Sequence, residues 1–196
     1  MTPDDRDPPR LTQPGPRVEV VPLGRVNLTA AHVVAGNLQA LLGLAARVGE
    51  PRPDPEEALV ANRGQYDARV VLEELAKGVG APFRLGVTAV DLCLPFLDYV
   101  FGEAQVGGRA AVVSLARLGG GRGAAGVPRE VMLERLAKVA LHETAHLLGL
   151  THCRAAGCLM SFSETLERID RISLAMCPGC RVDLARRRRR IVGPDG

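Results

Sequence analysis

The sequence predicts a protein of the α/β class with one main domain. Three stretches carry apolar residues at helical spacing, over residues 27–49, 66–77 and 128–149. Four short runs rich in β-branched or aromatic residues, over residues 17–23, 83–92, 97–105 and 109–118, indicate strands. At 196 residues, the chain is long enough for one domain with its own core, or for one domain and a small appendage.

The N-terminal half begins with a segment that we expect to be disordered. Residues 1–17 contain five prolines and several charges without periodicity. A first strand is predicted over residues 17–23, and a helix over residues 27–49 that ends at Gly49 before the sequence EPRPDP. His32 stands alone in this helix, so we interpret it as a surface or packed histidine. A second helix is predicted over residues 66–77.

The middle of the chain changes to strand patterns. The runs over residues 83–92, 97–105 and 109–118 are predicted to form two or three strands of one sheet. Cys93 lies in an apolar strand, where a small core residue is the expected role. The glycine-rich stretch over residues 119–128 lacks the G-x-x-x-x-G-K-[ST] pattern of a phosphate-binding loop, so it is predicted to be a flexible connection.

The C-terminal third is predicted to be helical. Pro128 fits the first turn of a helix that continues to Gly149. A shorter helix is predicted over residues 163–176, opened by a capping-box pattern of Ser161 and Glu164. Residues 181–196 contain six arginines and two aspartates, a net charge of +4 within a chain of net charge +3. The run Arg186–Arg190 is interpreted as a solvated helix end or frayed tail, with contact to nucleic acid or another acidic surface left open.

The composition excludes some classes of protein. No apolar run approaches the ~18 residues that a membrane-spanning helix needs. The N-terminus is acidic and proline-rich and lacks the pattern of a secretory signal. We therefore expect no membrane partner and a cytoplasmic, reducing location, where clustered cysteines more often bind metal than form disulfides.

Three of the four histidines fall in the sequence HETAHLLGLTH, at His142, His146 and His152. The first two are four residues apart, so on a helix they project about 40° apart and one turn from each other. On an unbroken helix His152 would lie roughly 15 Å beyond His142 and on another face. The chain must therefore turn back, and Gly149 permits this because glycine tolerates a positive φ at a helix C-terminus.

Three histidines with an open fourth position are typical of catalytic zinc, whereas structural zinc sites are filled by four protein ligands. The predicted function is hydrolysis of peptide bonds through a zinc-bound water, with Glu143 as general base and then general acid. The alternative for these residues alone is a surface helix that happens to carry histidines.

Four of the five cysteines form a second predicted metal site. Cys153 and Cys158 precede the sequence CPGC, which contains Cys177 and Cys180. Four thiolates in two pairs favour a closed structural zinc site, so two zinc ions are expected per chain. A redox-active CPGC is the competing interpretation, although it leaves the other pair without a role.

These motifs resemble the archaemetzincin family, a metzincin-like branch of the zinc metallopeptidases. The family signature is H-E-x-x-H-x-x-G-x-x-H-C, four residues, C-x-M and a later C-x-x-C, and this chain has HETAHLLGLTHC, RAAG, CLM and CPGC. Sixteen residues separate Met160 from Cys177, where seventeen are usual. QYDA, GVTAVDL, YVFGEA and VVSLARL are also similar to the family, so the likeness covers residues 18–181.

The resemblance implies a mixed, mostly parallel twisted sheet flanked by helices, with a cleft above His142. It also implies that Met160 forms a Met-turn beneath the catalytic metal. An edge strand around residues 99–103 or 112–115 would pair with extended substrate. On this basis residues 18–185 form a metallopeptidase domain ending in a zinc knuckle, and residues 186–196 form a basic tail.

Two hypotheses follow. The first is a zinc metallopeptidase that acts on a peptide or protein. The second is a catalytically silent zinc-binding module that recruits nucleic acid or an acidic partner through its arginine tail. Glu143 favours the first, because a pure binding module has no need of a carboxylate beside its first ligand.

Overall fold

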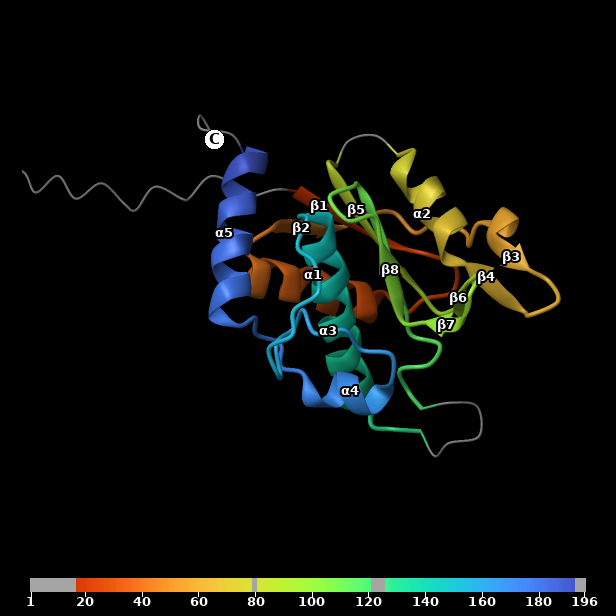
Figure 1. The fold of residues 1–196 in the computed structure, drawn as a ribbon. Helices are drawn as coiled ribbons and strands as arrows, with labels where there is room; N and C mark the ends of the chain where they lie inside the picture. Colours follow the sequence, from red (N-terminus) through yellow and green to blue (C-terminus); the bar gives the residue numbers. More distant parts are fainter. Residues whose placement is uncertain (1–16, 79–80, 121–125, 193–196) are drawn as a thin grey trace, which may run out of the picture.

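The computed structural model describes residues 17–78, 81–120 and 126–192. Its central feature is a five-stranded sheet with the order β2-β1-β5-β9-β8 (Figure 1). The strands are β1 (Arg17–Pro22), β2 (Ala45–Val48), β5 (Phe83–Thr88), β8 (Gly102–Ala104) and β9 (Ala110–Ser114). The first four in the spatial order run parallel, and β8 is antiparallel to β9 at the edge. The predicted α/β class, with a mixed and mostly parallel sheet, is confirmed.

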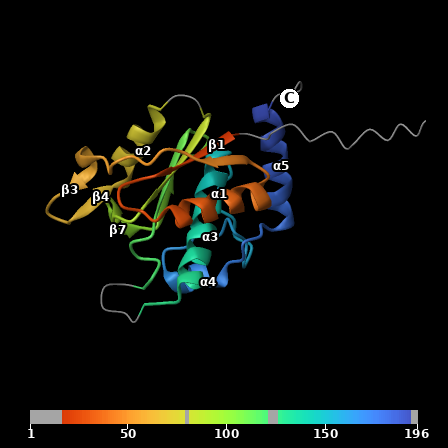
Figure 2. The same ribbon diagram turned by 180° about the vertical axis from the view of Figure 1, so that it is seen from behind.

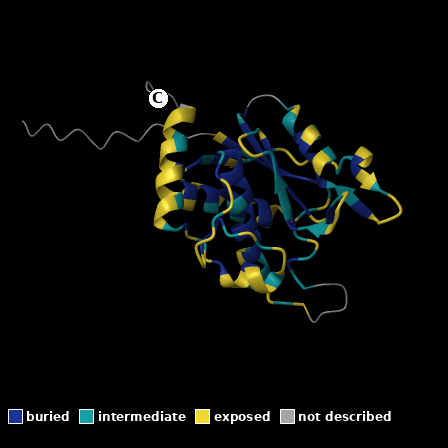
Figure 3. Ribbon diagram, in the orientation of Figure 1, coloured by how far each residue is buried: buried dark blue, intermediate teal, exposed yellow. Residues whose placement is uncertain are grey.

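Helices cover both faces of this sheet (Figures 1 and 2). On one face, α1 (Leu28–Leu42) packs against α3 (Arg129–Leu147), and α2 (Ala68–Ala76) lies on the other. Alternate residues of β9 accordingly enter two cores: Ala111 and Val113 face α1 and α3, while Ala110 and Val112 face α2. Strands β5 and β9 are buried along their whole length, as expected for central parallel strands (Figure 3).

The first helix is shorter than predicted. It ends at Leu42, where Gly43 adopts φ +59° and its N–H donates to the Gln39 carbonyl. Residues 45–48, predicted to be helical, instead form β2 and pair with β1. The helical prediction for residues 43–49 was wrong because apolar spacing continues through the turn, while the left-handed glycine reverses the chain onto the sheet edge.

A second, four-stranded sheet has the order β3-β4-β6-β7. It contains β3 (Leu59–Val60), which follows a short 3₁₀ helix η1 (Glu56–Ala58), β4 (Gln65–Asp67), β6 (Leu92–Leu94) and β7 (Leu97–Val100). Each of the three predicted runs over residues 83–118 contributes one strand to the central sheet, namely β5, β8 and β9, as expected. The two strands β6 and β7 of the second sheet were not predicted. The helix predicted from residue 66 begins at Ala68, because the Asp67 carboxylate accepts the Arg69 N–H as an N-cap.

Two C-terminal elements also differ from the prediction. Helix α4 (Leu166–Arg171) is capped by Thr165, whereas the Ser161 hydroxyl donates to the Ala155 carbonyl and opens no helix. Helix α5 (Pro178–Val192) contains the whole arginine run, so the expected domain limit at residue 185 falls within a helix. The expected disorder of residues 1–16, part of the glycine-rich loop (121–125) and the chain end (193–196) lie outside the described residues.

His32 is exposed on α1 and Cys93 is buried in β6, as expected for a surface histidine and a core cysteine. None of the helices in the described parts of the chain is long and apolar enough to cross a membrane.

Two glycines of the first helix region should respond oppositely to substitution. We expect Gly43→Ala to lower the free energy of unfolding by about 1–2 kcal/mol, because an L-residue is strained in the left-handed conformation. Gly36→Ala should raise it by about 0.5–1 kcal/mol, because Gly36 lies inside α1 with open space where a Cβ would stand. Urea denaturation of both variants measures the difference; equal effects would show that Gly43 does not end the helix.

Candidate metal centre and active-site cleft

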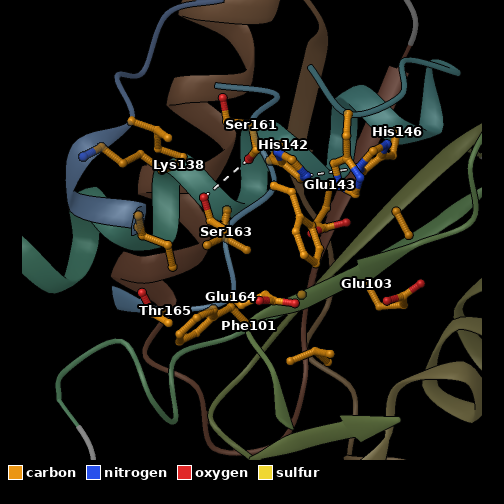
Figure 4. Close-up of a pocket in the computed structure, with 18 of the residues that line it drawn as sticks. Phe101, Glu103, Lys138, His142, Glu143, His146, Ser161, Ser163, Glu164 and Thr165 are labelled. Carbon is orange, nitrogen blue, oxygen red and sulfur yellow. Dashed lines mark hydrogen bonds between the residues drawn. The ribbon is translucent and has the colours of Figure 1, made fainter. Parts of the chain in front are cut away.

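Helix α3 presents His142 and His146 one turn apart, with their Nε2 atoms 3.0 Å from each other (Figure 4). The Nδ1 of His142 donates to the Leu159 carbonyl at 2.8 Å, and the Nδ1 of His146 donates to the Leu150 carbonyl at 2.7 Å. Because a carbonyl can only accept, both rings carry their proton on Nδ1. Both Nε2 atoms are therefore unprotonated, and each has a free lone pair.

This arrangement fits a bound cation. Burial lowers the pKa of His142 to about 4, and burial also lowers the pKa of His146. Both imidazoles are therefore neutral near pH 7, the form that binds metals. Two neutral rings with unprotonated nitrogens at 3.0 Å repel each other unless a cation lies between or beside them.

The third histidine reaches the same place through a turn at the end of α3. Gly149 has φ +87°, its N–H donates to the His146 carbonyl at 2.8 Å, and the Leu150 N–H donates to the Ala145 carbonyl at 3.1 Å. This pair of bonds is the Schellman motif, which closes a helix with a left-handed glycine. The ligand atoms of His142, His146 and His152 all lie within 4.8 Å of one another. The predicted reversal at Gly149 is confirmed.

A cavity of about 570 Å³ opens beside the histidines. Strand β8, helix α3, residues 161–165 and helix α4 form its walls (Figure 4). Glu143 lines it and is only 9% exposed. Burial raises the pKa of Glu143 well above its usual value, and the charge of Glu103 adds to the increase. Burial also raises the pKa of Glu103, which lines the same cavity.

Gly102 on β8 makes room for Glu143. A Cβ at this position would lie 2.8 Å from the Glu143 Cγ, 3.0 Å from the Val112 carbonyl oxygen and 3.0 Å from the Val139 Cγ1. Contacts this short do not occur for real side chains without displacement of a neighbour. The position of the Glu143 side chain therefore depends on a glycine at the sheet edge.

Sequence reasoning assigned no role to several residues of the cleft. Gly102 and Glu103 fall in a segment expected only as a candidate edge strand, and neither side chain was expected to lie beside Glu143. Lys138 is four residues before His142, so the helical spacing places it on the same face, and it is 4% exposed with its ammonium 2.9 Å from the Glu134 carboxylate. Phe162 packs on His152 with ring centroids 4.9 Å apart, and no sequence pattern pointed to it.

Tyr99 links two walls of the cleft. Its hydroxyl donates to the Glu164 carbonyl at 3.1 Å, and its ring lies 4.2 Å below the Arg117 guanidinium. Arg117 makes two hydrogen bonds to Asp91, at 2.7 and 2.6 Å. The end of β7 is thereby joined to the loop that precedes α4.

The four remaining cysteines of the motif also converge. The Sγ atoms of Cys153, Cys158, Cys177 and Cys180 lie within 4.8 Å of one another, and all four thiols are free. The 3.8 Å between Cys153 and Cys177 equals the sulfur–sulfur edge of about 3.8 Å expected for a tetrahedron with zinc–sulfur bonds of about 2.3 Å. The backbone N–H and thiol of Cys180 lower the pKa of Cys177 to about 7, whereas burial raises the pKa of Cys158 and of Cys180. A cluster of four thiols fits a closed metal site better than a redox pair.

The turn at Leu159 and Met160 connects the two clusters. The Leu159 carbonyl accepts from His142, and the Met160 carbonyl accepts the Cys153 N–H at 2.8 Å. Met160 itself is fully buried in the core shared by α1 and α3. Leu159 therefore orients His142, and Met160 holds Cys153, the residue after His152.

Comparison with known proteins gives consistent matches. A family model described as Peptidase family M54 matches residues 54–186. An archaemetzincin from Methanopyrus kandleri is 44% identical over 127 residues, which make up 64% of this chain and 69% of the relative. An archaemetzincin from Haloarcula marismortui is 32% identical over 170 residues, or 83% of this chain and 96% of the relative.

Solved structures agree with these sequence matches. The crystal structure of the Methanopyrus kandleri archaemetzincin has a TM-score of 0.78 at 36% identity, and the match covers 88% of this chain and 95% of that one. The Archaeoglobus fulgidus archaemetzincin, solved in complex with malonate, has a TM-score of 0.75 at 30% identity, with 85% and 99% covered.

Proposed function

The chain belongs to peptidase family M54 and is a zinc metallopeptidase, and from this premise we propose that Glu143 is the general base and acid of peptide-bond hydrolysis. The catalytic zinc is held by three imidazoles, those of His142, His146 and His152. The observation that carries this proposal is the pair of unprotonated Nε2 atoms at 3.0 Å from each other, with the third imidazole beside them and Glu143 in the adjoining cavity.

Zinc at this position supplies a Lewis acid that polarises the scissile carbonyl and acidifies the attacking water. The chain itself supplies the proton transfers. Glu143 accepts the proton of the attacking water and then delivers it to the leaving amine. Its low exposure keeps bulk water from competing for the carboxylate, and Gly102 fixes where the side chain lies.

Strand β8 is positioned to bind the substrate backbone. β9 lies inside the sheet, so the candidate around residues 112–115 is excluded, whereas β8 (Gly102–Ala104), at the end of the other candidate segment, is an edge strand. Phe101 accepts from the Ser114 N–H and the Gln105 N–H donates to Ala110, so residues 101, 103 and 105 bond toward β9. By the alternation of an antiparallel pair, the N–H and C=O of Gly102 and Ala104 point to the open edge. An extended peptide can add to this edge above the metal.

The four-cysteine site is proposed to hold a structural zinc. It fixes Cys153, the residue directly after His152, and so keeps the third ligand near the other two. Met160 is proposed as the Met-turn, with its side chain forming part of the apolar floor under the catalytic metal.

Removal of the Glu143 carboxylate should impair catalysis without affecting zinc binding. We expect Glu143→Gln to lower kcat/KM for cleavage of a mixed peptide pool by at least about 100-fold, because general-base catalysis contributes on that scale. Both zinc ions should remain bound. Mass spectrometry of the peptides and metal analysis of the same samples provide the measurement. If wild type binds two zinc ions but cleaves nothing that depends on Glu143, the silent binding module becomes the better description.

Metal content should report the two sites independently. Wild type is expected to bind two zinc ions per chain, and His146→Ala only one with the fold retained. Cys158→Ser should also lose one zinc, and its Tm should fall well below that of His146→Ala, because structural zinc sites contribute directly to folding. Fewer than two zinc ions in wild type would contradict the proposed ligand sets.

The close contact between Gly102 and Glu143 can be tested by substitution. Gly102→Ala should lower kcat about 10- to 100-fold, since displacement of a catalytic group by about 1 Å has effects of this size. Zinc content should stay unchanged. Gly126→Ala is the control, because a Cβ there meets nothing within 4 Å. Wild-type kcat in Gly102→Ala would show that Glu143 does not need this glycine.

A further inference from the structure

The C-terminal helix α5 contacts the body of the protein along one face. Cys180 lies in its first turn, Leu184 is buried one turn later, and Arg187 and Arg188 are half-buried in the next turn. Arg186, Arg189 and Arg190 are exposed. The arginine run is therefore divided between two arginines that pack inward and three that face solvent.

Arg187 lies against the turn that brings the third histidine into place. Its Nη1 occupies the space over Gly149, 2.4 Å from the point where a Cβ would stand. Gly149 is the left-handed residue that ends α3, where the last carbonyls carry partial negative charge. A guanidinium at this place stabilises the helix end electrostatically and packs on the turn itself.

Arg188 makes the equivalent contact at another helix. Its Nη1 lies 2.6 Å from the point where a Cβ of Gly43 would stand, and its Nη2 donates to the Gly43 carbonyl at 2.7 Å. Gly43 ends α1, which carries none of the clustered histidines or cysteines. Two neighbouring arginines thus pack on the C-termini of two helices, and only one of those helices leads to the metal centre.

Helix α5 holds the His152 segment at both ends. Upstream, Arg187 packs on Gly149, three residues before the histidine. Downstream, Cys153 directly follows the histidine, and its thiol gathers with those of Cys177 and Cys180 at the start of α5. His152 itself is exposed and stands on a loop, so its position depends on how these two ends are fixed.

We propose that α5 is a positioning element for the third zinc ligand and that Arg187 is its positioning residue at the upstream end. This inference rests on the proposed zinc site but not on hydrolysis. Residues that orient metal ligands from behind typically change metal affinity 10- to 100-fold when they are removed. The arginine run, interpreted from the sequence as a solvated helix end or frayed tail, then has a role inside the molecule.

The test compares three single variants of the full, zinc-loaded chain: Arg187→Ala, Arg188→Ala and Arg189→Ala. All three remove one positive charge from the same helix. Chelator competition gives the affinity of each zinc. Cobalt substitution then distinguishes the sites, because cobalt gives thiolate charge-transfer absorption only when cysteine binds it. Thermal unfolding gives the stability of each variant.

We expect Arg187→Ala to weaken zinc binding at the histidine site about tenfold and to change its cobalt spectrum, with the cysteine site unaffected. Arg188→Ala should lower Tm without changing either affinity, and Arg189→Ala should match wild type. Arg187→Lys should recover part of the affinity, because an ammonium group also favours a helix C-terminus.

Three results would overturn the inference. These are wild-type affinity in Arg187→Ala, an equal loss of affinity in Arg188→Ala, or an equal loss in Arg189→Ala. Absence of zinc from the histidine site of wild type would overturn both this inference and the proposed function. Zinc binding without peptide cleavage in wild type would leave the positioning result interpretable, so the two proposals can fail separately.

Discussion

The hydrogen bonds from two imidazole Nδ1 atoms to backbone carbonyls are the constraint on which the histidine cluster depends. These hydrogen bonds fix the tautomer of both rings. They leave both Nε2 atoms unprotonated, at 3.0 Å from each other. One carbonyl belongs to Leu150, beyond the turn that ends α3, and the other belongs to Leu159, beyond the third histidine. The segments that orient the first two ligands therefore flank the segment that supplies the third. The centre forms only when the chain has folded back over its own helix.

The fold-back is held by groups that come from distant parts of the sequence. Gly149 supplies the left-handed turn, and the Met160 carbonyl accepts the Cys153 N–H. The cysteines of α5 then meet those of the loop, and Arg187 packs on the turn from the other side. The cysteine cluster, helix capping and core packing all act on one short segment. Each has a local physical cause, and together they leave the exposed His152 little freedom.

The sheet contributes the other half of the site. Strand β8 is an edge strand, because β9 is its only partner among the described strands. It follows β7, which belongs to the second sheet. All three residues of β8 line the cavity, and its glycine leaves room for the Glu143 side chain. The proposed substrate-binding edge and the space for the proposed base thus share one residue, Gly102. A larger residue at position 102 would disturb both.

The sequence by itself predicted that the three histidines converge, because helical spacing and a glycine constrain how HETAHLLGLTH folds locally. It also determined the α/β class and the central strands β1, β5 and β9, whose apolar runs can only be buried. Only the tertiary structure decided where α1 ends, which strands leave the central sheet and which glycine accommodates Glu143. The same holds for the arginine run, whose charge suggested a tail until Arg187 and Arg188 were found against Gly149 and Gly43. These outcomes depend on contacts between residues tens to more than a hundred positions apart. Local periodicity carries no information about such contacts, because strand pairing and close packing depend on residues that are distant in the sequence.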